Sequence, residues 1–576
     1  MNYATSDPAL VPLIERYVAS EDREHLMPLV ERLGEDLDAR IADLGDQADK
    51  NPPVLHQYDR DGNRVDHIEQ HESYRELQRI AYEQYGLSAL SHRGLHGWEA
   101  APPQLVKYIL SYLFVQGEFG LACPVSMTDT AARTLKRFGD PDVFGEYVRG
   151  LTSTHPETRL TGAMFMTEIQ GGTDIARTET QAVPDGEGWR LSGQKWFTSN
   201  ADADVVMTLA RFPGGQENST RGVGLFMMPR VLPDGTRNTY FINRLKDKFG
   251  TRSMPSGEMT LDGAWALQVG ELDRGWLQMA EMVNTSRLSN AMRAVALMRR
   301  AVKEAAEFIR EREIFGRMLI DQPLMRRQIV PLQIDTEAGL GLIFYCGDQL
   351  QKGDDGDDQA KSLIRVLTPI AKHYLCKRAR HVTGEAMEIR GGSGYIEDFP
   401  YTRLVRDSHL GSIWEGSSNV IALDVLRCLR KFRSHYTLAD AMRAKLAAAE
   451  GTDAVPGAQT LAGVWDELVR RGDAILEVAD EEAQSRMRDY ADDLAVTIQS
   501  TLLFEEAVAE MSGSGRHRKL LVANTYLQTV VRGRTDALSV SLGWVNEILD
   551  GTDVDRDAAL DVLKRDIAQS PEPAGV

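Results

Sequence analysis

Cysteine is scarce in this chain of 576 residues, which contains four: Cys123, Cys346, Cys376 and Cys428. They are far apart and form no C-x-x-C pair, so neither a disulfide framework nor a thiolate zinc site is expected. Long apolar runs are also missing, because stretches such as 339–346 are far shorter than the ~20 residues that a membrane span needs. The first residues show no basic segment followed by an apolar one, which argues against a secretory signal. The sequence therefore predicts a cytoplasmic protein with no membrane span.

Positive charge is in short supply too. Lys and Arg number 66 against 85 for Asp and Glu, which gives a formal net charge of -19. Such a surface repels phosphate backbones, so nucleic acid is not the default partner. The 12 histidines are dispersed and H-E-x-x-H does not occur, so no metal site is predicted. Neither a G-x-S-x-G nucleophile elbow nor a G-x-G-x-x-G dinucleotide-binding loop is present.

The spacing of apolar residues predicts four domains. Helical spacing marks 1–157, 275–432 and 433–576, whereas short apolar segments bounded by Gly, Pro, Asp and Asn mark strands in 158–274. We expect an N-terminal helical domain, a central β domain, a helical bundle and a C-terminal helical extension, in that order. The fold class is thus α+β and mainly α. The segment 51–64, rich in Pro, Asp, Gly and Asn, is expected to be a loop.

One carboxylate is a candidate base. Glu415 directly follows Ile413 and Trp414 in GSIWEGSSNV and precedes a turn rich in Gly and Ser. A carboxylate against an indole and an aliphatic surface loses solvation, which raises its pKa toward the range useful for a general base. From these ten residues alone, an exposed glutamate that caps a helix is the simpler interpretation.

Three further segments each allow two interpretations. RGGSGY (390–395) follows a helical pattern and indicates a bend between helices more than a phosphate-binding loop. TEIQGGTD (167–174) is either a β turn or a loop that lets a flat ligand approach its backbone. KWFTSN (195–200) is either an ordinary strand or a strand whose aromatic and hydroxyl groups contact a flavin or a base.

Taken together and in order, these segments resemble a known family. MFMTEIQGGTD, GQKWFTSN, REIFG (312–316), RGGSGY and IWEGSSN are similar to the landmark motifs of the acyl-CoA dehydrogenase flavoproteins, over roughly 102–430. NPPVLHQYDRDGNRVD, RLKDKFGTRSMPSGE and the helical region after residue 433 resemble the branch named for the adaptive-response flavoprotein AidB.

The resemblance implies a fold and an assembly. The expected fold is an N-terminal helical domain, a central β-barrel and a C-terminal four-helix bundle, followed by an extra helical domain. FAD would lie between the β domain and the bundle, with part of its site supplied by a neighbouring subunit. The family's common assembly is a homotetramer built as a dimer of dimers.

The resemblance also implies roles for single residues. Glu415 matches the catalytic base, and acyl-CoA contacts are expected from Thr173, Arg287 and Trp414. Arg287 matches the arginine that lies under the catalytic carboxylate. The residues expected to contact FAD are Met164, Met166, Thr167, Thr173, Phe197, Thr198, Ser199, Arg312, Phe315, Gly391, Gly392, Trp414, Ser417 and Asn419.

Four positions depart from the family's commonest pattern. Phe197 replaces a frequent Trp, Trp414 a Tyr, Glu388 a Gln that usually contacts FAD, and Asn284 an Asp that faces the CoA arm. The changes at 197 and 414 suggest an altered acyl cavity.

The implied activity is α,β-dehydrogenation of an acyl-CoA, with an electron-transfer flavoprotein as electron acceptor. A second hypothesis, also from the AidB resemblance, is a flavoprotein that binds or protects DNA and has little dehydrogenase turnover. Its only basic cluster in the C-terminal extension is GRHRK (515–519), with Arg532 and Arg534 further along, and a solvated helix end is the simpler interpretation. A flavin oxidase or monooxygenase on the same fold is disfavoured, because Glu415 is present in the position of the base.

Overall fold

The computed structural model describes residues 2–564. They form two compact units, which we describe separately. The barrel unit comprises residues 24–289, and the bundle unit comprises residues 2–23 together with 290–564. The 37-residue helix α8 (Gly275–Glu311) contributes its first half to the barrel unit and its second half to the bundle unit. Helical spacing was expected from residue 275 onward.

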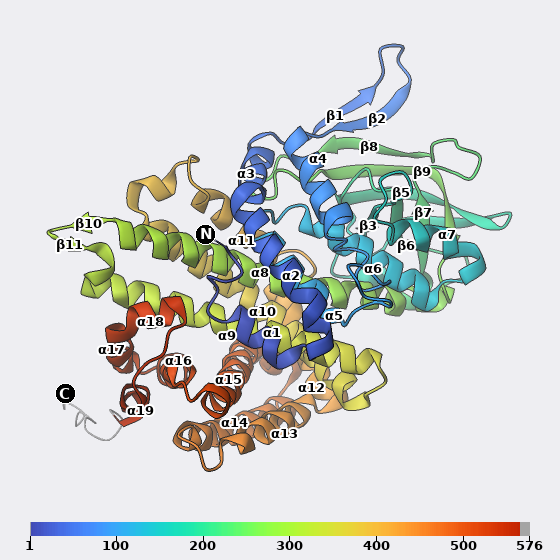
Figure 1. The fold of residues 1–576 in the computed structure, drawn as a ribbon. Coiled ribbons are helices and arrows are strands. Elements are labelled where there is room, and N and C mark those ends of the chain that lie inside the picture. The colour runs from blue at the N-terminus through green and yellow to red at the C-terminus, as the bar shows by residue number, and fades with distance from the viewer. Residues whose placement is uncertain (1, 565–576) are drawn as a thin grey trace, which may run out of the picture. The chain divides into compact units, whose positions relative to one another are not determined.

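The barrel unit is built on one seven-stranded sheet. Its strands are β3 (Gly162–Phe165), β4 (Gln181–Asp185), β5 (Gly188–Ser199), β6 (Val205–Arg211), β7 (Val223–Pro229), β8 (Tyr240–Leu245) and β9 (Ser256–Gln268). The sheet closes on itself, because β6 pairs with β4 along one edge and with β7 along the other, while β5 and β9 complete the ring. Apolar side chains such as Phe165, Val206 and Phe226 fill its core. The central β domain and its barrel form are thereby confirmed (Figure 1).

Helices precede the sheet in the barrel unit. They are α2 (Ser20–Asp36), which begins in the bundle unit, α3 (Ala42–Lys50), α4 (Glu72–Gln78), α5 (Gln104–Val115), α6 (Ala122–Phe138) and α7 (Pro141–Leu151). Helix α6 packs against β3, where the amide of Gly162 donates to Thr128 Oγ1 at 2.9 Å. Short 3-10 turns η4 (Thr220–Gly222) and η5 (Leu272–Arg274) lie between the later strands and before α8.

The segment 51–64, expected to be a loop, is instead most of a β-hairpin. Strands β1 (Val54–Tyr58) and β2 (Arg64–Glu69) pair antiparallel, and Figure 1 shows the hairpin projecting from the barrel unit. Its turn is held by Asp59, whose carboxylate accepts from the amides of Asp61 and Asn63. The Asp, Gly and Asn residues that suggested a loop are therefore the residues of the turn, and the strands on either side were missed.

Residues 290–432 of the bundle unit contain the second half of α8 and four further helices. These are α9 (Pro323–Asp354), α10 (Asp358–Ile389), α11 (Tyr401–Gly411) and α12 (Ser418–Phe432), with α1 (Leu10–Tyr17) against α9. Strands β10 (Glu313–Ile314) and β11 (Arg317–Met318) form a small hairpin after α8. The acidic segment 351–359 contains the turn between α9 and α10, where Asp357 accepts from two amides at the start of α10. RGGSGY forms the predicted bend, as the 3-10 turn η7 (Gly391–Tyr395).

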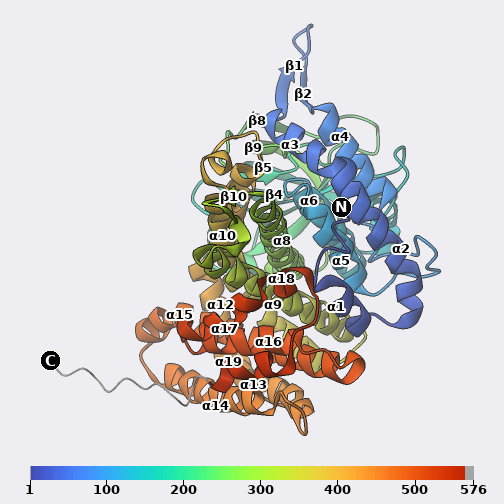
Figure 2. The ribbon, with the colours of Figure 1, turned by 60° about the vertical axis from the view of Figure 1, so that its left-hand side comes forward.

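The C-terminal extension, residues 433–564, is helical as expected and belongs to the bundle unit. Its helices are α13 (Ser434–Leu446), α14 (Val455–Glu477), α15 (Asp480–Ser514), α16 (Arg518–Tyr526), α17 (Leu538–Ser541), α18 (Val545–Asp550) and α19 (Arg556–Lys564). Figure 2 shows α14 beside α13, and α19 beside α16. Helix α15 also packs against α9, α10 and α12, so the extension is continuous with the bundle.

The basic cluster 515–519 is not a solvated helix end, so that interpretation is wrong. Arg518 and Lys519 are buried and both donate to the buried carboxylate of Glu337 on α9. Lys519 also lies 3.0 Å from Glu506. Arg516 donates to a backbone carbonyl of the extension. These cations neutralise buried carboxylates inside the bundle unit, so Arg518 and Lys519 offer no charge to a nucleic acid.

Candidate active site

The loop that carries Glu415 connects α11 to α12 and has an unusual backbone. Glu415 has φ of 57° and Gly416 has φ of 102°. The left-handed region is uncommon for a residue with a side chain and persists only where the surroundings impose it. Ser417, in an extended conformation, then precedes the first turn of α12.

Three buried side chains hold this loop through its carbonyl groups. Asn290 of α8 donates to the carbonyl at the end of α11, with 2.9 Å between Nδ2 and the oxygen. Lys372 of α10 donates to the carbonyl of Gly416. Its neighbour His373 donates from Nδ1 to the carbonyl of Ser418 at 3.2 Å. Each donor exposes 1% of its surface or less, so these hydrogen bonds are shielded from competing water.

The carboxylate of Glu415 is withdrawn from solvent, so the interpretation as an exposed cap is wrong. Its side chain is 6% exposed, and Oε1 lies 3.7 Å from Nη2 of Arg293, which is fully buried on α8. The Arg293 guanidinium also lies 4.8 Å from the centroid of the Trp414 ring. Arg293 was not predicted from the sequence, where it is one of several arginines on a long helix. A fixed, buried carboxylate of this kind is suited to accept a proton from a weak carbon acid.

A thiol also lies close to the loop. Burial raises the pKa of Cys376 on α10 to about 11; Lys372 opposes this shift and Glu415 adds to it. A thiol with a raised pKa is a weak nucleophile at neutral pH.

Other predicted residues of the bundle unit lie on exposed turns. Phe315 is 95% exposed at the tip of the β10–β11 hairpin, where it and Gly316 both have positive φ, as a two-residue hairpin turn requires. Arg312, just before this hairpin, is also exposed. A Cβ built on Gly391 or Gly392 would meet no atom within 4 Å, so both glycines face open space. Ser417 and Asn419 are exposed at the start of α12.

Apart from Arg287 on α8, the predicted residues of the barrel unit lie on β3, on β5 and on the segment after β3. The amide of Trp196 donates to the carbonyl of Thr167 at 2.8 Å, so the TEIQ segment lies beside β5. The ring of Phe197 is 55% exposed, and Nζ of Lys246 lies 4.5 Å from its centroid. This leaves an aromatic face accessible next to a cation. Ser199, on the same strand, is half-buried.

A buried ion pair that the sequence interpretation missed fixes the TEIQGGTD segment. Nζ of Lys195 lies 2.7 Å from Oε1 of Glu168, and the two side chains are 0% and 4% exposed. Glu168 also accepts from the hydroxyl and amide of Thr180, and Lys195 donates to the carbonyl of Leu209. Lys195 belongs to the KWFTSN motif, but the sequence does not show that Glu168 is its partner. The pair ties the segment to the barrel wall.

The other five predicted residues range from exposed to fully buried. Met164 and Met166 are half-buried, and Thr173 is exposed. Thr198 is fully buried, with its hydroxyl toward Gly257. Arg287 donates to Oδ1 of Asn284 at 3.2 Å. Its predicted role beneath Glu415 stays a prediction.

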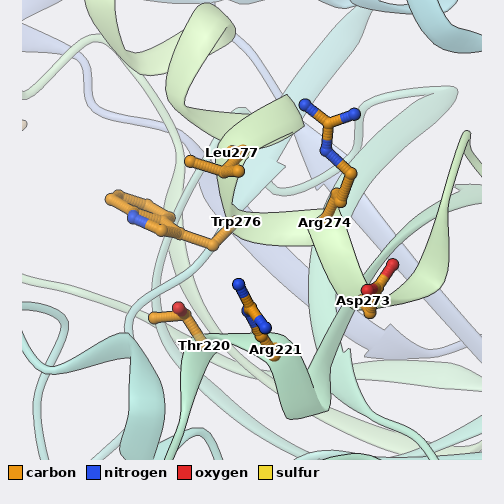
Figure 3. A pocket seen from close by; sticks show the side chains of 6 residues that line it. All are labelled: Thr220, Arg221, Asp273, Arg274, Trp276 and Leu277. Carbon is orange, nitrogen blue, oxygen red and sulfur yellow. The ribbon is translucent and has the colours of Figure 1, made fainter.

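A separate pocket lies on the barrel unit, where η4, η5 and the start of α8 meet. Figure 3 shows the side chains around it, among them two guanidinium groups and an indole. The lining residues are Thr220, Arg221, Asp273, Arg274, Trp276 and Leu277. None of them is a predicted site residue, so this pocket does not enter the candidate site.

Family models match most of the chain. The model for the adaptive response protein AidB N-terminal domain matches residues 1–157. The models for the middle and C-terminal domains of acyl-CoA dehydrogenase match residues 163–264 and 273–429. The chain belongs to the acyl-CoA dehydrogenase family, whose members are oxidoreductases that act on CH–CH groups.

Individual relatives agree with this assignment. The putative acyl-CoA dehydrogenase AidB of Escherichia coli is 34% identical over 455 residues, which cover 76% of this chain and 80% of that protein. Acyl-CoA dehydrogenase family member 11 of Caenorhabditis elegans is 32% identical over 435 residues, covering 73% and 69%. The crystal structure of Caenorhabditis elegans ACDH-11 in complex with C11-CoA matches with a TM-score of 0.83 at 27% identity, covering 98% of this chain and 94% of that one. The predicted fold, with its extra C-terminal helices, is thereby confirmed.

Within the described residues, 2–564, no helix is both long enough and apolar enough to cross a bilayer.

Proposed function

We propose that this protein is an FAD-dependent acyl-CoA dehydrogenase that forms a 2,3-double bond in an acyl-CoA thioester. In this proposal Glu415 removes the α-proton of the acyl group. The observation that carries the proposal is the buried carboxylate of Glu415. Its loop is held by hydrogen bonds that Asn290, Lys372 and His373 donate to backbone carbonyl groups.

The surroundings of Glu415 suit this step. A thioester α-proton is a very weak acid, so its removal needs a base with little hydration and a fixed position. The low exposure of the carboxylate provides the first condition, and the constrained backbone provides the second. Trp414, held under the Arg293 guanidinium, would line the acyl side of the site.

The residues present fit FAD. An exposed aromatic face at Phe197 suits a flat ring system, and the open space in front of Gly391 and Gly392 suits close approach of a cofactor backbone. When bound, FAD would supply the acceptor for the β-hydride. Ser417 and Asn419, at the start of the 15-residue helix α12, are positioned to bind an anionic group such as its diphosphate. The remaining contacts we propose are those of Met164, Met166, Thr167, Thr173, Thr198, Ser199, Arg312, Phe315 and Trp414.

The assembly we propose is a homotetramer, a dimer of dimers in which a partner subunit's FAD receives Arg312 and Phe315. The support is the β10–β11 hairpin, which presents a phenylalanine that is 95% exposed. A phenylalanine exposed to this degree is available for contact with a ligand or a partner subunit. An electron-transfer flavoprotein is the electron acceptor that we propose.

The substrate that we propose is an acyl-CoA, and a relative supports this choice. ACDH-11, similar over nearly the whole chain, was crystallised with C11-CoA, so C11-CoA is the first substrate to test. The DNA-binding alternative depended on the cluster 515–519, in which Arg518 and Lys519 form buried ion pairs with Glu337. We therefore rank it second.

The experiment is anaerobic reduction of the purified flavoprotein by straight, branched and aromatic acyl-CoAs, followed by flavin absorbance. Wild type is expected to bleach with at least one of them. Glu415→Gln should retain FAD and bleach about 10²–10⁴ times more slowly. Glu385→Gln, a glutamate on α10 that bonds Gln328, is the control and should bleach like wild type. Equal bleaching by Glu415→Gln and wild type would remove Glu415 from its role.

A further inference from the structure

We propose that Lys246 holds a buried positive charge beside the flavin ring and makes bound FAD easier to reduce. This inference rests on the proposed function only in so far as FAD packs on Phe197. The observation that carries it is an ammonium group on a side chain that is 10% exposed, close to both aromatic rings of the KWFTSN motif.

A bulge in the sheet brings the two aromatic rings to one place. The register between β5 and β9 shifts after Lys195. As a result, Trp196 and Phe197 together lie opposite one residue of β9, Glu258. Bulges of this kind occur next to active sites, where they re-aim a side chain. Nζ of Lys246 lies 3.7 Å from the centroid of the Trp196 ring and 4.5 Å from the centroid of the Phe197 ring.

The carboxylate of Glu258 fixes the ammonium group in this position. Its Oε1 lies 2.7 Å from Nζ of Lys246 and 2.7 Å from Nη2 of Arg244 on β8. One carboxylate thus binds two cations, so the three groups together carry one net positive charge. Arg244 is 61% exposed and is screened by water, whereas Lys246 is largely buried and is screened much less. The charge that acts on the neighbouring rings is therefore that of Lys246.

A positive charge at this place favours the reduced cofactor. A flavin that accepts a hydride gains one negative charge. The ring of Phe197 is 55% exposed, and aromatic rings that pack together have centroids about 4.5–7 Å apart. A flavin ring packed on Phe197 therefore lies within about 12 Å of Nζ of Lys246. In an effective dielectric of about 20, one charge at that distance changes an equilibrium about tenfold.

The test is the midpoint potential of the bound flavin at about pH 8, measured anaerobically against a reference dye without acyl-CoA. Lys246→Met should lower the ratio of reduced to oxidised flavin at a fixed potential about tenfold, which is about 30 mV for a two-electron couple. Glu258 keeps Arg244 in this variant, so no buried carboxylate is left without a cation. Lys246→Arg keeps the positive charge and should stay close to the wild-type potential.

Arg244→Met is the matched control, because it removes the same charge from the same carboxylate. Among the described residues, Arg244 lies over neither of the two rings, and its exposure predicts a potential close to that of wild type. A shift in Lys246→Met no larger than the shift in Arg244→Met would overturn the proposal.

FAD affinity, measured by equilibrium dialysis, is the second readout. It distinguishes a change in the potential of bound FAD from a loss of FAD. If Lys246→Met loses FAD and the FAD that stays bound keeps the wild-type potential, the lysine has only a structural role and the proposal is overturned.

The outcomes also separate this inference from the proposed function. A lowered potential in Lys246→Met, in a protein that no acyl-CoA bleaches, would support the role of the lysine and contradict the dehydrogenase activity. Bleaching of wild type by an acyl-CoA, with no shift of potential in Lys246→Met, would overturn the role of the lysine alone. A wild-type protein that binds no FAD would overturn both.

Discussion

The buried cluster around Glu337 gives a stability prediction whose size follows from the structure. Glu337 and Arg518 are each 1% exposed, and the carboxylate also binds Lys519 at 2.9 Å. Glu337→Gln keeps the shape of the side chain but leaves two buried cations to share Glu506. Removing one partner of a buried ion pair costs about 3–5 kcal/mol, because the remaining charge is left uncompensated.

The assay is urea unfolding of the apoprotein, followed by circular dichroism. With an m value of about 3 kcal/mol/M, this loss shifts the first transition by about 1–1.7 M. The control is Asp550→Asn. Asp550 also joins the extension to α8, through Arg310, but the pair is 47% and 34% exposed and is expected to contribute about 0–1 kcal/mol. A shift for Glu337→Gln no larger than that for Asp550→Asn would refute the reasoning.

The pH dependence of the stability of wild type and of Glu337→Gln is a second check. Burial alone would raise the pKa of Glu337, but Arg518 and Lys519 outweigh it and hold the pKa well below the ordinary 4.5. A carboxyl whose pKa is lowered on folding adds stability that is complete above its unfolded pKa and is lost as the pH falls toward its folded pKa. The difference between wild type and Glu337→Gln should therefore be constant from pH 7 to about 5 and shrink only in stronger acid. A difference that grows on acidification would contradict this assignment.

Three further predictions concern the candidate site. Lys195→Met leaves Glu168 buried without its cation, so it should free the TEIQGGTD segment and weaken FAD retention at least tenfold in equilibrium dialysis. Unchanged retention would contradict the anchoring role. Arg312→Ala should lower both FAD retention and the apparent Tm, with added FAD restoring part of the Tm; a monomer that keeps stoichiometric FAD would exclude a shared site. Wild type should show no duplex DNA binding that survives physiological salt, because Arg518 and Lys519 are buried; a salt titration that finds tight binding would put the DNA-binding function first.

Much of the fold could be predicted because its signals are local. The apolar stripe of α8, the acidic turn before α10 and the strands β5 to β9 each show their period and their boundaries within a few residues. Strand β4, with one buried residue in five, carries no such signal. In the hairpin of β1 and β2 the turn residues dominate the composition, so its strands were missed.

The parts that could not be predicted depend on partners distant in sequence. From the sequence alone, Arg518 and Lys519 suggest a basic surface. Their partner Glu337 lies more than 180 positions earlier, and only the fold brings it to them. Arg293 and Glu415 are likewise brought together only by the packing of α8 against the loop. A charge pattern along one segment indicates how many charges there are, but not whether they meet solvent or one another.

The central claim is that Glu415 takes the α-proton, and exchange of that proton with solvent tests it most directly. The holoenzyme is incubated in D2O with a 3-thia acyl-CoA, which has an acidic α-position but no β-hydrogen to lose, and deuterium uptake is measured by mass spectrometry. Wild type is predicted to label the α-carbon, and Glu415→Gln to do so about 10²–10⁴ times more slowly with unchanged FAD content. Labelling at the wild-type rate by Glu415→Gln would contradict the account.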